Sequence, residues 1–181
     1  MRFEATAIAG VYVVDIEPSR DERGLFARLH CESAFEQAGV TFRAVQTSLS
    51  RNTARHTLRG MHFQTGEAGE AKLVRVVRGA VFDVVLDLRA GAGPADWIGV
   101  ELTAENARAL YIPHGCAHGF LTLTADADVL YQMDRPHDPT RAAGLSWNDP
   151  AVAIAWPNPP EVISAKDQSW PAFSFAQGDR K

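Results

Sequence analysis

The chain has 181 residues, of which 46% are hydrophobic and 22% charged, and its formal net charge at pH 7 is -4. The length predicts a single domain over residues 1–181, and the negative charge argues against a general nucleic-acid-binding protein. No run of about twenty apolar residues occurs and the N-terminus lacks a secretory signal pattern, so we predict a cytoplasmic protein without membrane contact.

Most apolar runs are short, β-branched and separated by turn residues. Helical patterns are limited to residues 31–40 and 103–110. Residues 72–88 have the pattern of a strand, a turn at Arg78-Gly79 and a second strand. Further strand patterns occur at residues 97–103, 107–113 and 119–133. Many short strands with Gly, Pro and Asp in the turns favour an all-β sandwich or jelly-roll barrel.

The segment VFDVVLDLR alternates between two faces. One face carries Phe82, Val84, Leu86 and Leu88. The other face carries Val81, Asp83, Val85 and Asp87. The first face predicts a core, and the second is polar enough to line a cavity or a subunit contact. Residues 147–171 are rich in Pro and Trp and predict an irregular C-terminal segment that wraps over the barrel.

Polar residues interrupt three strand-like segments, LRGMHFQ, AKLVRVV and YIPHGCAHGF. The hypothesis is that antiparallel strands of one barrel point four of their residues inward: Arg59, His62, Lys72 and His118. Taken singly, each has an ordinary explanation: a surface ion pair, a hydrogen-bonded strand histidine, a solvated strand end and a turn cap. Their coincidence favours a functional site.

Metal binding is weakly supported by these segments. Pro113 to His118 matches the second signature of cupin barrels, P-x-G-x-x-H, whose histidine is normally a metal ligand. The first cupin signature contributes a His-x-His pair, whereas this chain has only His62, followed in the next strand by Lys72. An ammonium repels a divalent cation and offers no lone pair. We therefore predict a barrel with no metal and no cofactor.

Seven stretches together resemble one known family, in order and over nearly the whole chain. They are DERGLF, LRGMHFQ, KLVRVVRGAVFDVVLDLR, YIPHGCAHGFLTL, LYQM, WNDP and ISAKD. They resemble the dTDP-4-dehydrorhamnose 3,5-epimerase family. The resemblance implies a metal-free cupin jelly roll, a homodimer, and an isomerase of deoxysugar biosynthesis that acts on a nucleotide-linked 4-keto-6-deoxyhexose, with dTDP as the expected nucleotide.

The resemblance assigns four catalytic residues. A carbonyl at carbon 4 acidifies the hydrogens on carbons 3 and 5, so epimerisation needs a base, a proton donor on the opposite face and a group that stabilises the enolate. His62 matches the base and Asp167 the carboxylate that orients it. Tyr131 matches the proton donor, and Lys72 lies where it stabilises the enolate oxygen.

The resemblance also assigns the residues that bind the nucleotide. Arg23 and Arg59 bind the diphosphate, because a guanidinium matches phosphate oxygens bidentately. The other assigned contacts are hydrogen bonds from Gln46 and His118, packing by Phe26, and Lys166 reaching toward the nucleotide. Gly60 lies between Arg59 and His62, where a side chain is expected to obstruct the pocket.

The chain departs from its family near the nucleotide. Pro136 and His137 stand where an aromatic pair ending in tyrosine is usual, so the identity of the base stays open. Arg28 replaces a usual glutamate, and the segment from Gln46 to Ser48 replaces one that commonly ends in asparagine. These departures border the nucleotide site, whereas the proton-transfer residues are retained.

Three other functions remain open. The same catalytic residues suit an enzyme that inverts only carbon 3 or only carbon 5, on a different nucleotide sugar. A keto-isomerase between carbons 3 and 4 uses the same barrel with a differently placed base pair. A non-catalytic sugar-nucleotide-binding cupin needs no proton transfer, so uptake of deuterium from heavy water into a 4-keto sugar nucleotide separates it from the enzymes.

Overall fold

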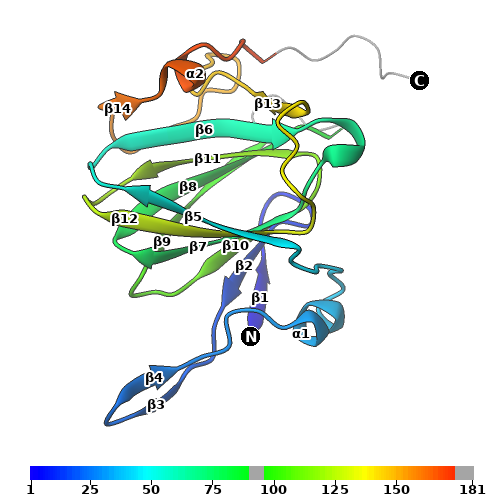
Figure 1. Ribbon diagram of the computed structural model, residues 1–181, viewed down its shortest axis with the longest axis vertical. Coiled ribbons are helices and arrows are strands. Elements are labelled where there is room, and N and C mark those ends of the chain that lie inside the picture. Colours follow the sequence, from blue (N-terminus) through cyan, green and yellow to red (C-terminus); the bar gives the residue numbers. More distant parts are fainter. Residues whose placement is uncertain (90–95, 174–181) are drawn as a thin grey trace.

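Two facing six-stranded sheets form the body of the molecule (Figure 1). The computed structural model describes residues 1–89 and 96–173. The first sheet has the order β1 (Arg2–Ala5), β2 (Tyr12–Asp15), β10 (Ala109–Ile112), β7 (Lys72–Arg78), β12 (Ala127–Met133) and β5 (Gln46–Asn52). The second has the order β13 (Ala142–Gly144), β6 (Thr57–Gln64), β11 (Cys116–Thr122), β8 (Ala80–Asp87) and β9 (Trp97–Thr103), and β14 (Val162–Ile163) pairs in parallel with β6. This arrangement confirms the predicted all-β jelly roll.

The predicted strand-turn-strand unit of residues 72–88 corresponds to β7 and β8. The turn between them contains Gly79, whose φ of 70° lies in the left-handed region that glycine adopts without steric penalty. The two strands belong to different sheets. The turn therefore carries the chain from one layer of the jelly roll to the other and does not close a hairpin.

Only one of the two predicted helical segments forms a helix. The first contains α1 (Glu32–Gln37), which buries Phe35 in an aromatic cluster with residues of the first sheet. The prediction for residues 103–110 is wrong, because Thr103 and Asn106 close a turn by accepting each other's backbone N–H at 2.9 and 3.1 Å. Among the described residues, no helix is long and apolar enough to span a membrane.

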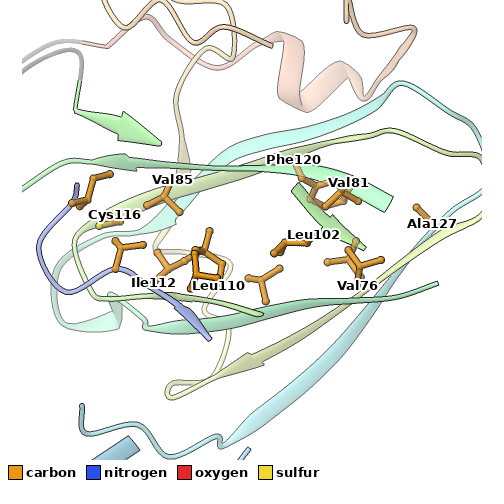
Figure 2. Close-up of a cluster of buried hydrophobic side chains, with 14 residues drawn as sticks. Val76, Val81, Val85, Leu102, Leu110, Ile112, Cys116, Phe120 and Ala127 are labelled. Carbon is orange, nitrogen blue, oxygen red and sulfur yellow. The ribbon is translucent and has the colours of Figure 1, made fainter. Parts of the chain in front are cut away.

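Buried apolar side chains fill the space between the two sheets (Figure 2). Val76 of β7, Val81 and Val85 of β8, and Phe120 of β11 belong to this cluster and are almost inaccessible to solvent. Burial of apolar surface contributes roughly 25 cal/mol per Å², so this cluster stabilises the packing of the two sheets against each other.

The two faces of β8 alternate as predicted, but both are buried. Val81 and Val85 lie in the interior, and Asp83 shares their side of the strand with no exposed surface. Val84 and Leu86 belong to a separate cluster with side chains of the C-terminal segment. The polar face therefore holds a buried carboxylate inside the barrel.

The C-terminal segment, residues 145–173, lies along the second sheet near β6 (Figure 1). Most of it is irregular, as predicted. Leu145, Val152 and Trp156 pack against the outward side chains of β8. Two short elements were not predicted: β14 and the helix α2 (Ala165–Gln168).

A two-stranded hairpin projects away from the sandwich (Figure 1). It consists of β3 (Ser19–Asp21) and β4 (Gly24–Phe26). Leu25 and Phe26 are 53% and 80% exposed. The hairpin therefore carries two large apolar side chains on its surface.

Candidate active site

A cavity of about 500 Å³ lies where β5, β6, β7 and β12 meet the C-terminal segment. This volume is within the usual range for small-molecule sites. Nine residues predicted from the sequence line it: Gln46, Ser48, Arg59, His62, Lys72, Tyr131, His137, Lys166 and Asp167. Strands far apart in the sequence therefore bring the predicted residues to one place.

Gly60 allows β6 to approach β11 closely beside this cavity. Its φ is 143°, and a Cβ at this position would lie 2.6 Å from the Cα of Gly119. The contact is with backbone and has no flexible side chain to give way. A side chain at Gly60 would collide with the neighbouring strand, and its effect on the pocket stays a prediction.

His62 and Asp167 form a hydrogen-bonded pair in the cavity wall. His62 Nε2 lies 2.6 Å from Asp167 Oδ1. Asp167 is held at the start of α2, where its backbone N–H donates to Ser164 Oγ at 3.0 Å. With Nε2–H donated to the carboxylate, the lone pair of the imidazole is on Nδ1, for which the described residues provide no hydrogen bond. This is the arrangement of a general base oriented by an acid.

The surroundings of Asp167 favour its ionised form. Burial opposes ionisation, but hydrogen bonds from His62, Trp170 and the backbone of Gly60 outweigh it, and the pKa of Asp167 is lowered. The carboxylate is therefore negative at neutral pH and stabilises an imidazolium on His62.

Tyr131 enters the cavity from β12. Burial raises the pKa of its phenol well above the ordinary value of 10.0, the Asp83 carboxylate raises it further, and Arg59 opposes the shift. His118 is only 3% exposed, contacts the Tyr131 ring at a centroid distance of 5.7 Å, and bonds Asp83 Oδ1 through Nε2 at 2.7 Å. Tyr131 is therefore a neutral phenol at physiological pH, with an O–H that can donate a proton.

Lys72 is held by a carboxylate that the sequence analysis did not assign. Its Nζ lies 3.2 Å from Glu70 Oε1, and both side chains are at most 10% exposed. Gln64 Nε2 donates to the other Glu70 oxygen at 2.8 Å. An ammonium has three donors, so Lys72 retains N–H groups for a ligand oxygen after pairing with Glu70.

The remaining cations give the cavity an excess of positive charge. Arg59 and Lys166 form no ion pair within residues 1–89 and 96–173. Arg59 Nε donates to Asn52 Oδ1 at 2.7 Å, which fixes the guanidinium without neutralising it. Glu70 and Asp167, the carboxylates that line the cavity, already bond Lys72 and His62. The site therefore suits an anionic ligand such as a phosphate ester.

The sequence matches the family model of dTDP-4-dehydrorhamnose 3,5-epimerase over residues 5–174. The chain belongs to this family. The dTDP-4-dehydrorhamnose 3,5-epimerase of Salmonella typhimurium is 42% identical over 177 residues, which cover 94% of each chain. The crystal structure of the Bacillus anthracis enzyme with TDP and PPi bound has a TM-score of 0.91 and 34% identity, covering 95% of this chain and 99% of that one. The resemblance and the fold class predicted from it are confirmed.

One relative in the comparisons has a narrower name. A dTDP-4-dehydrorhamnose 3-epimerase of Streptomyces niveus is 37% identical over 170 residues, covering 93% of this chain and 82% of the relative. Names within the epimerase family therefore differ in the sugar carbons that they specify: carbons 3 and 5 for the Salmonella typhimurium relative, and carbon 3 alone for the Streptomyces niveus relative.

Four residues predicted for the substrate site do not line the cavity: Arg23, Phe26, Arg28 and His118. Arg23 lies on the β3–β4 hairpin with 83% of its side chain exposed and pairs with Asp21. Phe26 ends the same hairpin, and Arg28 follows it and contacts Cys31 Sγ at 3.5 Å. Their roles in this epimerase-family chain stay predictions, as does the hydrogen bond from His118 to the ligand.

Sequence reasoning missed several cavity residues of this family member. Glu70 belongs to the segment EAGE, which has the composition of a solvated loop. Trp170 belongs to a stretch whose composition predicts irregular coil, and its N–H donates to Asp167 Oδ1 at 3.2 Å. The spacing of Asp167 and Trp170 is the local signal that could have found this contact, because residues three apart in a helical turn are neighbours.

The metal-free prediction is compatible with the donor set in the cavity. No group of three or more His, Cys, Asp or Glu side chains within the described ranges is arranged to hold a metal ion. Each carboxylate that lines the cavity is occupied, Glu70 by Lys72 and Asp167 by His62. The absence of a cofactor itself stays a prediction.

The protonation of Tyr131 can be measured directly. Because burial raises its pKa well above 10.0, the phenol should stay neutral between about pH 7 and pH 10. Ultraviolet difference titration of the wild-type chain against Tyr131→Phe should show no tyrosinate from Tyr131 in this range. A tyrosinate signal near pH 8 that disappears in Tyr131→Phe would contradict the neutral phenol.

Proposed function

We propose that this chain epimerises a nucleotide-linked 4-keto-6-deoxyhexose at carbon 3, carbon 5 or both. The observation that carries the proposal is a His62–Asp167 pair in the same cavity as a protonated Tyr131 and an ammonium at Lys72. This set suits removal of a proton next to a carbonyl and its replacement from another side chain.

The reaction uses each group once. His62 Nδ1 takes the hydrogen from the carbon next to the carbonyl, and the electron pair of the broken C–H bond moves into the enolate. The Lys72 ammonium stabilises the enolate oxygen, and Asp167 stabilises the imidazolium. Tyr131 then donates its proton to the opposite face of the carbon, which inverts the centre, and both side chains exchange protons with water before the next cycle.

Arg59 and Lys166 bind the diphosphate in this proposal. Both are cationic, line the cavity and lack a carboxylate partner in the described part of the chain. The TDP and PPi bound to the Bacillus anthracis relative support a nucleotide diphosphate as the ligand class. Gln46 accepts the backbone N–H of His137 at 3.0 Å and donates to Ser48 Oγ at 3.3 Å. These three residues form the surface offered to the nucleotide base.

Single-position epimerisation is the second candidate. The Streptomyces niveus relative, named a 3-epimerase, favours this alternative. One base reaches both carbons 3 and 5 only if the sugar changes its orientation in the site, so the choice depends on the freedom of the bound sugar and not on the catalytic groups.

Deuterium uptake tests the function. A dTDP-linked 4-keto-6-deoxyhexose incubated with the chain in heavy water should gain deuterium with inversion at carbon 3, carbon 5 or both, resolved by NMR. Uptake at one carbon assigns the single-position activity. A folded chain that binds dTDP but catalyses no uptake would refute the enzyme and favour the non-catalytic cupin.

Deuterium uptake should also persist after exhaustive chelation. Activity that follows about one bound transition metal per chain would contradict the metal-free mechanism.

The predicted homodimer forms part of the proposal. The exposed Leu25 and Phe26 of the hairpin, together with Leu49 and Val77 on the first sheet at 53% and 45% exposure, supply apolar surface for a second copy. Arg23 lies on the same hairpin, outside the cavity of its own chain. We propose that the hairpin brings Arg23 and Phe26 to the cavity of the second copy.

Mixing inactive variants tests this exchange. Arg23→Ala mixed with His62→Ala should recover about a quarter of wild-type activity, since half of the reassorted dimers contain one intact site of two. Lys72→Ala mixed with His62→Ala is the matched control and should recover nothing, because both residues act within one chain. Absence of recovery in the first mixture, in dimers shown to exchange subunits, would contradict the role of the hairpin.

A further inference from the structure

Trp170 contacts the catalytic pair directly, although none of the steps above uses it. It follows α2 in the C-terminal segment and lines the cavity. Its indole N–H donates to Asp167 Oδ1 at 3.2 Å, the same oxygen that lies 2.6 Å from His62 Nε2. The ring also meets the His62 imidazole edge-on, with the centroids 6.3 Å apart.

The indole ring also holds a cation of the cavity. Lys166 Nζ lies 5.3 Å from the ring centroid. A cation at this distance from an indole face is attracted by the ring quadrupole. One side chain therefore contacts the base, the carboxylate that orients the base, and an ammonium proposed to bind phosphate.

Gly144 provides the space for this ring. A Cβ on Gly144 would lie 2.4 to 2.5 Å from three atoms of the Trp170 indole. The backbone beside the ring is tied down, since the Ser146 N–H donates to Pro171 O at 2.8 Å. Gly144 pairs with His62 across β13 and β6, so the indole packs directly over the strand that carries the base.

We propose that Trp170 is a positioning residue: its N–H orients the carboxylate of the His62–Asp167 pair, and its ring holds the ammonium of Lys166 in place. The proposal rests on the function proposed above. The two parts of the side chain have separable consequences: the N–H acts on turnover through the carboxylate, and the ring acts on substrate binding through the cation.

The direction of the effect follows from the charge on Asp167. A donated N–H stabilises the carboxylate, so its loss makes Asp167 more basic and strengthens its hold on the imidazolium of His62. His62 then releases its proton only at higher pH. Five other ionisable groups of the cavity form no hydrogen bond, ion pair or ring contact with Trp170 among the described residues: Arg59, Glu70, Lys72, Tyr131 and His137. The sixth, Lys166, keeps an aromatic ring beside it in Trp170→Phe. The acid limb of the kcat/KM profile should therefore move to higher pH.

Two substitutions separate the N–H from the ring. Trp170→Phe should lower kcat about tenfold, leave KM within about twofold of wild type, and move the acid limb up by roughly half a pH unit. Trp170→Ala should lower kcat similarly and also raise KM severalfold, since Lys166 loses the ring. Trp156→Phe is the matched control: it loses an indole bond to Trp147 O at 2.9 Å and does not line the cavity.

Gly144→Ala tests the same contact without changing Trp170. The methyl group should displace the indole and reproduce the acid-limb shift of Trp170→Phe in a chain with an unchanged far-ultraviolet spectrum. Kinetics of Trp170→Phe equal to those of Trp156→Phe, with no displacement of the acid limb, would overturn the proposal.

A spectroscopic measurement separates failure of this proposal from failure of the epimerase function. In ¹⁵N-labelled protein without substrate, Asp167→Ala should move the indole resonance of Trp170 and speed its exchange with solvent, while the resonances of Trp97, Trp147 and Trp156 stay in place. An unchanged Trp170 resonance would refute the contact. Absence of deuterium uptake by the wild-type chain, with this resonance still responding, would refute the function alone.

Discussion

His62→Ala should lower the rate of deuterium uptake by about 100- to 10,000-fold, the usual contribution of a general base. The substitution removes the imidazole whose Nε2 bonds Asp167, while Arg59 and Lys166 still bind the diphosphate. We expect dTDP affinity to change little, because the substituted group acts on the sugar. Single-turnover kinetics in heavy water and calorimetric titration with dTDP measure the two quantities separately.

The chain offers a matched control for His62. His114 also bonds an aspartate, Asp134, through Nε2 at 2.6 Å, but it does not line the cavity. His114→Ala should therefore retain near-normal uptake. Near-normal turnover in a folded His62→Ala chain would refute the assignment of the base.

Tyr131→Phe should lower the rate of net epimerisation by about 100-fold or more, while exchange of the sugar hydrogens with solvent continues. The substitution removes the phenol and leaves His62, Asp167 and Lys72 in place, so the base still abstracts a proton and returns one to the same face. Deuterium then enters the sugar with retained configuration. NMR that resolves carbons 3 and 5 distinguishes retention from inversion and reports each centre separately.

Tyr111→Phe is the control for Tyr131→Phe. Tyr111 is also a buried tyrosine, at 7% exposure, and burial raises its pKa to about 12, but it belongs to the aromatic cluster beside α1. The Tyr111→Phe chain should epimerise the substrate at a rate close to that of the wild-type chain. Loss of both exchange and epimerisation in a Tyr131→Phe chain that still binds dTDP would instead give Tyr131 a role in positioning the substrate.

The sequence predicts a cavity residue well where a polar side chain stands within an otherwise apolar strand. His62 and Lys72 lie in apolar strands, where a polar residue is visible as an interruption of the pattern, whereas the assignment of Tyr131 rests on the family resemblance. Asp167 was assigned through the family resemblance, because a carboxylate beside a short helix has no local feature that points to a histidine 105 residues away.

The features that sequence reasoning missed depend on contacts between distant segments. The sequence around Glu70 is typical of a solvated loop, whereas in the structure its side chain is only 8% exposed and pairs with Lys72. Residues 103–110 have a helical pattern, yet two side-chain hydrogen bonds close a turn there. The position of the Arg23 hairpin outside its own cavity is a consequence of tertiary structure, which local periodicity does not encode.

Asp167 follows every strand of the barrel in chain order, so the two members of the catalytic pair are made at different times. Strands β1 to β13 all precede Ser164, and a ribosome releases them first, at roughly 5–20 residues per second. The imidazole and the aspartate that orients it are therefore synthesised 105 residues apart. The hydrogen bond between them can form only after α2 has been made and has docked beside β6.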